Sequence, residues 1–346
     1  MRRSVGQIAF LGSGETSLAG GRIFEALAKN LDVPPRIALL ETPAGFELNS
    51  AQVVGKVGDF MMTRLQNYKP HVDVIPARKK ESDFSPDDPE IIRPLLHANM
   101  IFMGPGSPTY AIRNLKDTLA WDVIRARHRL GATLIFASAA TISVGAHALP
   151  VYEIYKVGMD VHAVDGLDYF KDFGVHLSFT PHWNNAEGGA DLDTSRCFVG
   201  MDRYDEWCDL VPVENTTLGL DEHTGIIMDF ETGTCEVSGV SSVSIVRECD
   251  PEIYPSGSKF ELKEIGDFKI PDPIESDIPS RAWDMVVNAP PLEDTTPSDE
   301  VVSLAEKRLT ARAEKNWAES DKLRDEIAAL GWAVQDSKDG YRLIKE

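Results

Sequence analysis

Apolar residues in the first half of the chain fall into short unbroken runs that alternate with longer segments of helical periodicity. The short runs predict buried strands and the longer segments predict helices. Strands separated by helices are typical of a parallel sheet that is covered on both faces. An α/β fold with a mainly parallel sheet is therefore predicted. The predicted strands are 7–12, 36–40, 72–76, 100–103 and 133–136, and the predicted helices are 17–29, 49–67, 89–97 and 110–130.

The second half of the chain changes character twice. Residues 174–247 are richer in strand-like patterns, with a hairpin predicted around the turn 231–234. Proline and acidic residues then accumulate without periodicity, and the tail predicts helices at 299–315 and 317–330 followed by a short β-hairpin. These patterns divide the chain into an α/β domain at 1–250, a linker or surface arm at 251–297 and a small helical hairpin module at 298–346.

Composition and charge exclude several classes of protein. The 346 residues are 42% hydrophobic and 26% charged, as in globular proteins that dissolve in water. No apolar run approaches the ~20 residues of a membrane span. The four cysteines show no CxxC spacing, so we expect a reduced, cytoplasmic protein without a metal site or other cofactor. A net charge of −20 argues against nonspecific binding to nucleic acid or to an anionic membrane.

The most informative motif is the apolar run that ends at Ser138 and continues into Ala139 and Ala140. A buried strand that stops at a serine before a small-residue helix has the layout of a nucleophile elbow, which lifts a hydroxyl above the sheet. The N–H groups at the start of the helix can then stabilise a developing oxyanion. The alternative interpretation is an ordinary strand end with a serine helix cap.

Three further motifs supply the groups that such a serine needs. A glycine loop at 104–107 directly follows a predicted strand and can turn N–H groups toward a ligand. His182 and Glu222 each follow a further predicted strand. A hydroxyl needs a base to remove its proton, and an imidazole base needs a carboxylate to fix its tautomer. Taken alone, a single histidine or carboxylate also fits a structural or solvated role.

In this order the motifs resemble those of the dipeptidase E and cyanophycinase family of serine peptidases, which have a class I glutamine amidotransferase-like fold. The resemblance covers roughly residues 7–247, and the segment 218–224 looks like the cyanophycinase pattern Gly-Ile-Asp-Glu-x-Thr-Ala. It implies that Ser138 is the nucleophile, that His182 is the general base and that Glu222 is the carboxylate that orients the base.

The resemblance also implies roles for neighbouring groups. The backbone N–H groups of Gly106 and Ala139 would form the oxyanion hole. In dipeptidase E the acidic residue lies shortly after the nucleophile, at the position of Glu153 here, so Glu153 is the alternative to Glu222. The family cleaves aspartyl or β-aspartyl linkages, whose carboxylate needs a pocket rich in cations or N–H groups. Candidate substrate-binding residues are Ser107, Arg113, Asn184 and Arg196.

Two positions depart from the usual Gly-x-Ser-Ala-Gly elbow of the family, because Phe136 and Ala140 replace the glycines. A Phe136 ring lying between Ser138 and His182 would prevent catalysis. The leading hypothesis is a serine hydrolase that cleaves small peptides or amides of acidic amino acids through an acyl-enzyme, with a homodimer expected from the fold family alone. The alternative hypothesis is a catalytically inactive binding protein of the same fold, whose tail recruits RNA or a protein partner.

The tail closely resembles the C-terminal helical hairpin of cysteinyl-tRNA synthetase, through its Ala-Arg-Ala, Asp-x-x-Arg-Asp-Glu and Leu-Gly-Trp steps. The synthetase's catalytic motifs do not occur in the sequence, which excludes aminoacylation. The resemblance leaves two interpretations, an RNA contact and a folded cap or dimerisation element. Nine Lys/Arg against eleven Asp/Glu over 298–346 favour the second. The candidate RNA-binding residues are Lys307, Arg308, Arg312, Lys315 and Arg324.

Overall fold

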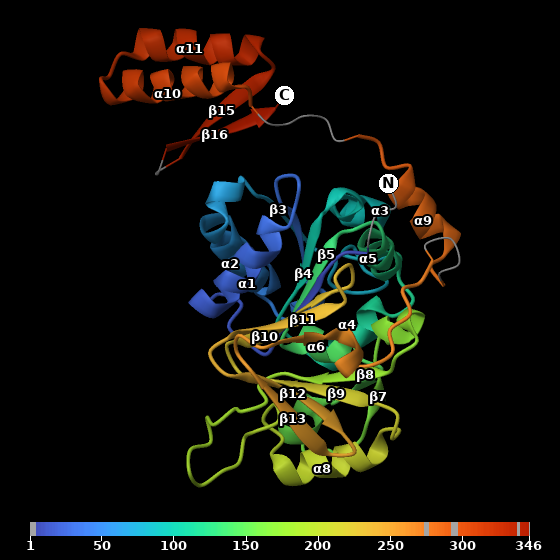
Figure 1. Ribbon diagram of the computed structural model, residues 1–346. Helices are drawn as coiled ribbons and strands as arrows, with labels where there is room; N and C mark the ends of the chain where they lie inside the picture. Colours follow the sequence, from blue (N-terminus) through green and yellow to red (C-terminus); the bar gives the residue numbers. More distant parts are fainter. Residues whose placement is uncertain (1–4, 273–276, 292–296, 338–339, 346) are drawn as a thin grey trace. The chain divides into compact units, whose positions relative to one another are not determined.

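The computed structural model describes residues 5–272, 277–291, 297–337 and 340–345, which belong to two compact units (Figure 1). The first unit, Met1–Ala289, contains the two large sheets that carry the candidate site. The second, Pro290–Glu346, is called the C-terminal unit below.

An eight-stranded sheet forms the centre of the first unit. Strands β1, β5, β4, β2 and β3 run parallel, and β10, β11 and β14 continue the sheet antiparallel on the other side of β1. The predicted α/β class with a mainly parallel sheet is confirmed. In order across the sheet, the strands are β14 (Lys259–Glu261), β11 (Thr234–Gly239), β10 (Thr224–Asp229), β1 (Ile8–Leu11), β5 (Thr133–Ala137), β4 (Met100–Met103), β2 (Arg36–Leu40) and β3 (His71–Ile75).

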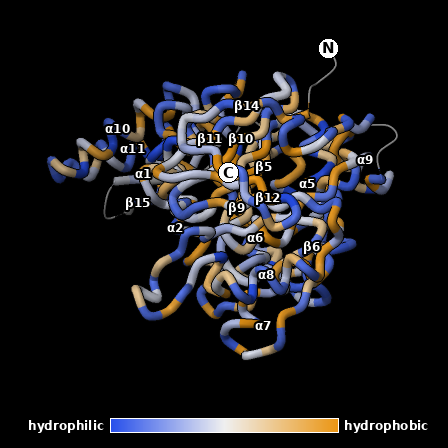
Figure 2. Tube along the Cα trace, turned by 60° about the horizontal axis from the view of Figure 1, so that its bottom comes forward, coloured by the Kyte–Doolittle hydropathy of each residue, from blue (hydrophilic) through white to orange (hydrophobic). Residues whose placement is uncertain are grey.

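Helices cover both faces of this sheet. Successive strand residues point to opposite sides, so each strand has apolar side chains to bury on both faces. Leu39 and Phe102 belong to a core cluster with α1 and α2, whereas Leu40 and Met103 belong to a second cluster that includes α5 and α9. Figure 2 shows the apolar stretches along the strands in the middle of this unit. The covering helices are α1 (Leu18–Lys29), α2 (Ser50–Arg64), α3 (Pro89–Ile92), α5 (Leu119–Arg129) and α9 (Ser280–Val287).

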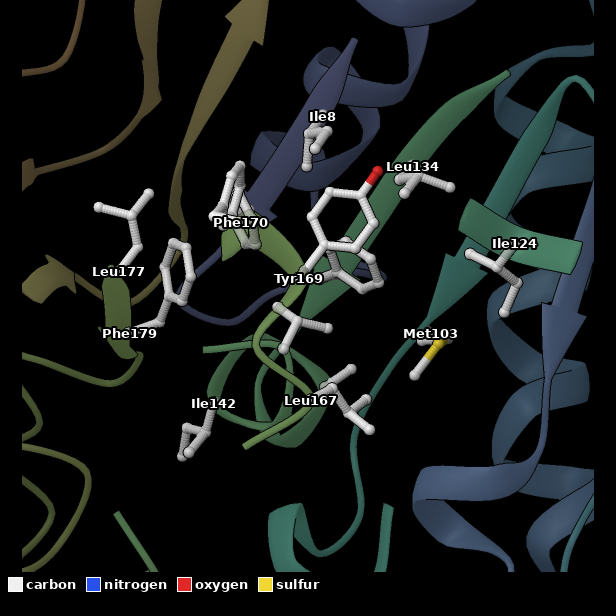
Figure 3. Packing of buried hydrophobic residues seen from close by; sticks show 14 of the residues in the cluster. Ile8, Met103, Ile124, Leu134, Ile142, Leu167, Tyr169, Phe170, Leu177 and Phe179 are labelled. Atoms are coloured by element: carbon white, nitrogen blue, oxygen red, sulfur yellow. The ribbon is translucent and has the colours of Figure 1, made fainter. Parts of the chain in front are cut away.

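A second, four-stranded sheet shares the second of these core clusters. Its strand β8 is parallel to β9, and β12 and β13 continue it antiparallel. Phe179 of β8 stacks on Phe10 of β1 with ring centroids 4.2 Å apart, so one aromatic core joins the two sheets (Figure 3). The remaining elements of this region are β8 (Leu177–Thr180), β9 (Thr216–Leu220), β12 (Ser242–Arg247), β13 (Asp250–Pro255), β6 (His147–Ala148), β7 (Val164–Asp165) and α8 (Met201–Leu210).

The single helix predicted at 110–130 is two helices in the structure, α4 (Pro108–Leu115) and α5. Between them Asp117 has a φ of 59°, and the Thr118 side chain caps the start of α5. A residue in the left-handed conformation ends a helix. The apolar periodicity continues across this break, so the sequence pattern predicted one helix instead of two.

The segment 251–297, predicted as a linker or surface arm, contains β13, β14 and α9 where it is described. Pro251 and Pro255 lie in β13, which is an edge strand, where a missing N–H is tolerated. Buried Ala282 and Val286 of α9 belong to the same core cluster as α5. Backbone pairing holds β13 and β14, and Leu262, Ile265 and Ile278 also belong to this core cluster.

The C-terminal unit is a helical hairpin followed by a β-hairpin, which confirms the predicted helical hairpin. Its small core contains Val301, Ala305, Ile327 and Trp332. Across both units, none of the described helices is long and apolar enough to cross a bilayer. The elements of the C-terminal unit are α10 (Asp299–Ala313), α11 (Trp317–Ala329), β15 (Trp332–Ser337) and β16 (Gly340–Lys345).

An ion pair connects α10 to β15 within the C-terminal unit. The buried Arg308 guanidinium donates from Nη1 and Nη2 to the two carboxylate oxygens of Asp336, at 2.7 and 3.2 Å. The hydrogen bonds from Arg308 lower the pKa of Asp336, against an opposing effect of partial burial. Because the folded-state pKa is lowered, the pair stabilises the unit above the ordinary pKa range of an aspartate. That stabilisation is lost as the pH falls through the lowered value.

Candidate active site

Ser138 directly follows the last residue of β5, which lies inside the large sheet, and begins the turn into α6 (Ala139–Ser143). Its φ of 52° and ψ of −118° are sparsely populated by residues with a side chain. The chain thus changes abruptly from strand to helix at Ser138, which is the layout that the sequence motif predicts. Ser138 N donates to Leu11 O at 3.2 Å, and Ala140 N donates to Gly104 O at 3.3 Å, so backbone bonds to two neighbouring segments hold the turn.

Ser138 takes part in a continuous chain of hydrogen bonds with a histidine and a carboxylate. Its Oγ lies 3.1 Å from His182 Nε2, and His182 Nδ1 lies 3.0 Å from Glu222 Oε1. His182 follows β8 and Glu222 follows β9, so two neighbouring strands of the second sheet present them to the end of β5. With Nδ1 protonated, the imidazole donates to Glu222 and accepts from the Ser138 hydroxyl. This arrangement can take a proton from Ser138.

The Glu222 carboxylate is held by its neighbours. Asn185 Nδ2 donates to Glu222 Oε1 at 3.0 Å, and the Glu222 backbone N–H donates to Asn184 Oδ1 at 2.8 Å. Partial burial acts to raise the pKa of Glu222, but the hydrogen bonds from His182 and Asn185 outweigh it and lower the pKa. The carboxylate therefore stays ionised at neutral pH and can hold His182 in one tautomer.

Glu153, the alternative acidic residue, has a different partner. It lies on α7 (Val151–Tyr155), and its Oε1 accepts a hydrogen bond from Thr109 Oγ1 at 2.5 Å in the first turn of α4. Thr109 Oγ1 is also 3.1 Å from Ser107 Oγ, the helix cap of α4. Glu153 thus supports the start of α4, where a negative charge is favourable. The geometry favours Glu222 as the carboxylate that acts on His182.

The glycine loop reaches the site in a conformation that requires glycine. Gly106 has a φ of 147°, and a Cβ built there would lie 1.9 Å from Pro43 O. The next N–H, that of Ser107, donates to the same Pro43 O at 2.9 Å, which fixes the loop. Gly106 and Ala139 both line the cavity beside Ser138. Their N–H groups are the candidates for binding an oxyanion on the substrate.

The cavity beside Ser138 has a volume of about 130 Å³. His182 and Ser138 lie on its wall together with the two candidate oxyanion residues. The other wall residues are mostly apolar or aromatic and come from α6, from α7 and from the segment after His182. They include Ile142, Val151, Tyr152, Tyr155 and Phe198.

The residues expected to bind substrate lie outside the lining of this cavity. Ser107 caps α4 by accepting a hydrogen bond from Tyr110 N at 3.2 Å. Arg113 is exposed and lies over the Tyr110 ring, 5.2 Å from its centroid. Arg196 lies 3.7 Å from the ring centroid of Trp183 and donates to Trp183 O. Asn184 supports the Glu222 backbone instead. The structure gives Ser107 and Asn184 supporting positions and places both arginines on aromatic rings.

Phe136 does not lie between Ser138 and His182. Its ring is fully buried in the core between the two sheets, stacked on Phe10 with centroids 5.5 Å apart. Phe136 pairs with Phe10 and Met103 in the neighbouring strands, and its side chain points to the face that carries the second sheet. A phenylalanine in place of the usual glycine therefore adds volume to the core and does not separate Ser138 from His182.

Several residues of the site were not singled out from the sequence. Asn185 holds Glu222, and Tyr152, Tyr155 and Phe198 line the cavity. Asn185 gave one signal, because it lies three residues after His182 on a strand-end loop. The aromatic residues gave none, because an aromatic side chain alone predicts only burial.

The C-terminal unit matches a known domain family. Residues 298–342 match the family model of the cysteinyl-tRNA ligase anticodon binding domain. The cysteine–tRNA ligase of Pseudomonas putida is 34% identical over 122 residues, and that of Chlamydia felis is 53% identical over 47 residues. These matches cover 34% and 14% of this chain, but 25% and 10% of the ligases. The chain thus spans about a quarter of the first ligase and less of the second. The resemblance stated for the tail is confirmed.

The chain is similar in fold to a solved peptidase. The crystal structure of a peptidase from an acI-B1 Actinobacterium matches it with a TM-score of 0.60 at 18% sequence identity. The match covers 75% of this chain and 98% of that one. At this identity the similarity shows a shared fold. The protein therefore combines a peptidase-like fold with a C-terminal unit similar to the anticodon binding domain of cysteinyl-tRNA ligases.

Asn185→Ala should raise the pKa of Glu222, because it removes one of the two hydrogen bonds that lower it. Carboxyl ¹³C NMR of glutamate-labelled protein measures this pKa. Asn184→Ala is the matched control, since Asn184 bonds only the Glu222 backbone in this group of contacts and should leave the pKa nearly unchanged. Equal shifts in the two variants would contradict the assigned hydrogen bonds.

Proposed function

We propose that the first unit is a serine hydrolase of the peptidase type, with Ser138 as the nucleophile, His182 as the general base and Glu222 as its orienting carboxylate. One observation carries this proposal, the unbroken hydrogen-bonded chain of 3.1 and 3.0 Å that starts at a serine in an elbow turn. An ordinary serine cap needs no such backbone strain and no histidine at its hydroxyl. The peptidase-like fold supports the same conclusion.

In the proposed reaction, Ser138 Oγ attacks the carbonyl carbon of an amide bond while His182 Nε2 takes the hydroxyl proton. The N–H groups of Gly106 and Ala139 stabilise the negative oxygen of the tetrahedral intermediate. His182 then gives its proton to the leaving amine, and the C–N bond breaks to leave an acyl-enzyme. A water molecule then attacks this ester while His182 takes its proton, and His182 returns that proton to Ser138 Oγ as the acid is released.

The proposed substrates are small peptides or amides, since the cavity of about 130 Å³ holds a single compact group. The resemblance to dipeptidase E implies an acidic residue at the scissile bond. Its carboxylate needs a positively charged partner. The two candidate cations, Arg113 and Arg196, lie over Tyr110 and Trp183 outside the lining. The structure thus lends support to a small substrate and gives none to an acidic side chain.

Hydrolysis of a mixed dipeptide and isoaspartyl-peptide panel tests the proposed function with four proteins. Ser138→Ala should lower kcat by about 10⁴-fold or more, because the nucleophile is lost. Glu222→Gln should lower it by about 10²- to 10⁴-fold, because the tautomer of His182 is no longer fixed. Glu153→Gln is the matched control and should act like the wild type, because the amide keeps an oxygen for Thr109.

Activity that survives Ser138→Ala would contradict the nucleophile. A loss in Glu153→Gln as large as in Glu222→Gln would contradict the choice of acidic residue. If the folded wild-type protein hydrolyses nothing in the panel, the alternative hypothesis of a catalytically inactive binding protein gains support.

A second candidate function, contact with RNA, is favoured by the match of the C-terminal unit to an anticodon binding domain. Lys307 and Lys315 are exposed and can reach phosphate groups. Other basic side chains of the unit already bind carboxylates, as Arg308 and Arg312 do with Asp336. The described side chains of this unit include few cations without a carboxylate partner, and the chain has a net charge of −20, so we propose a weak contact that depends strongly on salt.

Titration of bulk tRNA with the full chain at about 50 mM salt tests this contact. Binding should weaken steeply as salt increases, and Lys307→Glu together with Lys315→Glu should reduce the affinity about 10-fold or more. Lys156→Glu, a charge change on the first unit, is the matched control. Undetectable binding at low salt, or equal losses in both variants, would contradict the RNA contact and leave the folded cap as the role of this unit.

A further inference from the structure

We propose that the cavity beside Ser138 accepts a compact apolar side chain, aliphatic or aromatic, on the residue whose carbonyl is attacked. This inference rests on the proposed function, because it identifies the cavity as the subsite next to the nucleophile. It replaces the acidic substrate implied by the sequence resemblance with a hydrophobic one. Four observations carry it, and each concerns residues that line the cavity or act on its electrostatics.

The first observation is the chemistry of the wall. Beyond the residues assigned to the reaction, the lining is apolar or aromatic except for one thiol and two phenol hydroxyls. It contains no lysine or arginine and no carboxylate among the residues that the structure describes. A carboxylate moved from water into such a cavity would lose its hydration without gaining a cation, which is costly. An apolar group gains free energy in the same transfer.

The second observation concerns the Cys197 thiol and the Tyr152 phenol of the wall, which are neutral at pH 7 because burial raises the pKa of each. Burial raises the pKa of the Cys197 thiol to about 12, with a further contribution from the nearby Glu222 charge. Burial also raises the pKa of Tyr152, with smaller contributions from Cys197, Tyr155 and the Glu47 charge. The ionised groups that help to raise these two pKa values, Glu222 and Glu47, are negative. They would repel a substrate carboxylate and leave an apolar side chain unaffected.

The third observation is a strained segment that builds one side of the cavity. Arg196, Cys197 and Phe198 have consecutive positive φ angles of 56°, 60° and 71°. Residues with a side chain seldom adopt this conformation, and it persists where surrounding contacts enforce it. Here Arg196 N donates to Trp183 O and Cys197 N donates to His182 O, at 3.0 and 3.1 Å. The segment is thereby fixed to the backbone of the candidate base, and it brings Cys197 and Phe198 to the cavity wall.

The fourth observation is the shape and size of the cavity. The Phe198 ring stacks on Tyr155, with centroids 5.6 Å apart and planes inclined by 17°, and lies 5.6 Å from the His182 ring. The three rings thus form a continuous aromatic surface from His182 to Tyr155 on α7. A dry apolar cavity of about 150 Å³ in another protein holds a benzene molecule. The volume of about 130 Å³ therefore suits a branched aliphatic or small aromatic group.

Lys156 is a cation that contacts two tyrosines of this wall. Its ammonium lies over the rings of Tyr152 and Tyr155, 4.9 and 5.5 Å from their centroids, and the side chain is exposed and outside the lining. A cation–π contact of this kind engages the ammonium with the tyrosines. The Lys156 ammonium could therefore attract the carboxylate of an acidic substrate, so the test includes a substitution of Lys156.

The test uses amides with one common leaving amine and an acyl residue that is leucine, phenylalanine, asparagine or aspartate. Asparagine separates the effect of charge from that of shape. Wild-type kcat/KM for the leucine and phenylalanine amides should exceed that for the aspartate amide by about 10-fold or more. Phe198→Ala should reduce this preference, because it opens the wall. Lys156→Gln, the matched control, should leave the preference unchanged.

Binding of the same amides to Ser138→Ala, measured by isothermal titration calorimetry, tests the cavity without turnover. The leucine and phenylalanine amides should again bind about 10-fold or more tighter than the aspartate amide. An aspartate amide that is bound or cleaved as well as the apolar ones would overturn the inference, as would a loss of aspartate cleavage alone in Lys156→Gln. If no amide is cleaved by the wild type, the proposed function fails, and the binding order still decides the inference.

Discussion

The candidate site depends on one backbone constraint, the turn at Ser138. A φ of 52° with a ψ of −118° costs about 1–3 kcal/mol for a residue with a side chain, so the surrounding structure must enforce it. Strand β5 does so because it is paired on both sides, with β1 and β4, and is buried along its whole length. The Ser138 hydroxyl therefore projects from the end of the sheet in a fixed orientation, and the other groups of the site lie around it.

The second sheet supplies the partners of Ser138, and the aromatic core fixes its position. Phe179 of β8, three residues before His182, stacks on Phe10, which pairs with Phe136 of β5. His182 N also donates to Gly12 O, and Trp183 N donates to Leu220 O. The same packing that stabilises the fold therefore sets the distance between Ser138 and His182. Phe136, a departure from the family elbow, acts as part of this packing.

The sequence predicted those features that local patterns determine. Unbroken apolar runs mark strands buried on both faces, and Ser138 directly follows such a run. His182 and Glu222 each lie two residues beyond the end of a strand that also contains polar residues. Features that depend on contacts distant in sequence gave no local signal. Phe198 reaches the cavity through a left-handed segment whose conformation no residue type predicts. The separate bonding of Glu153 to Thr109 is likewise a tertiary contact.

The central claim is that His182 activates Ser138, and covalent labelling tests it most directly. A fluorophosphonate reacts with a serine whose proton an adjacent base removes, and peptide mapping by mass spectrometry locates the adduct. The account predicts one adduct, on Ser138, in the wild-type protein, and a large loss of labelling in a folded His182→Ala variant. An unlabelled Ser138 in the folded wild type, or equal labelling in both proteins, would contradict it.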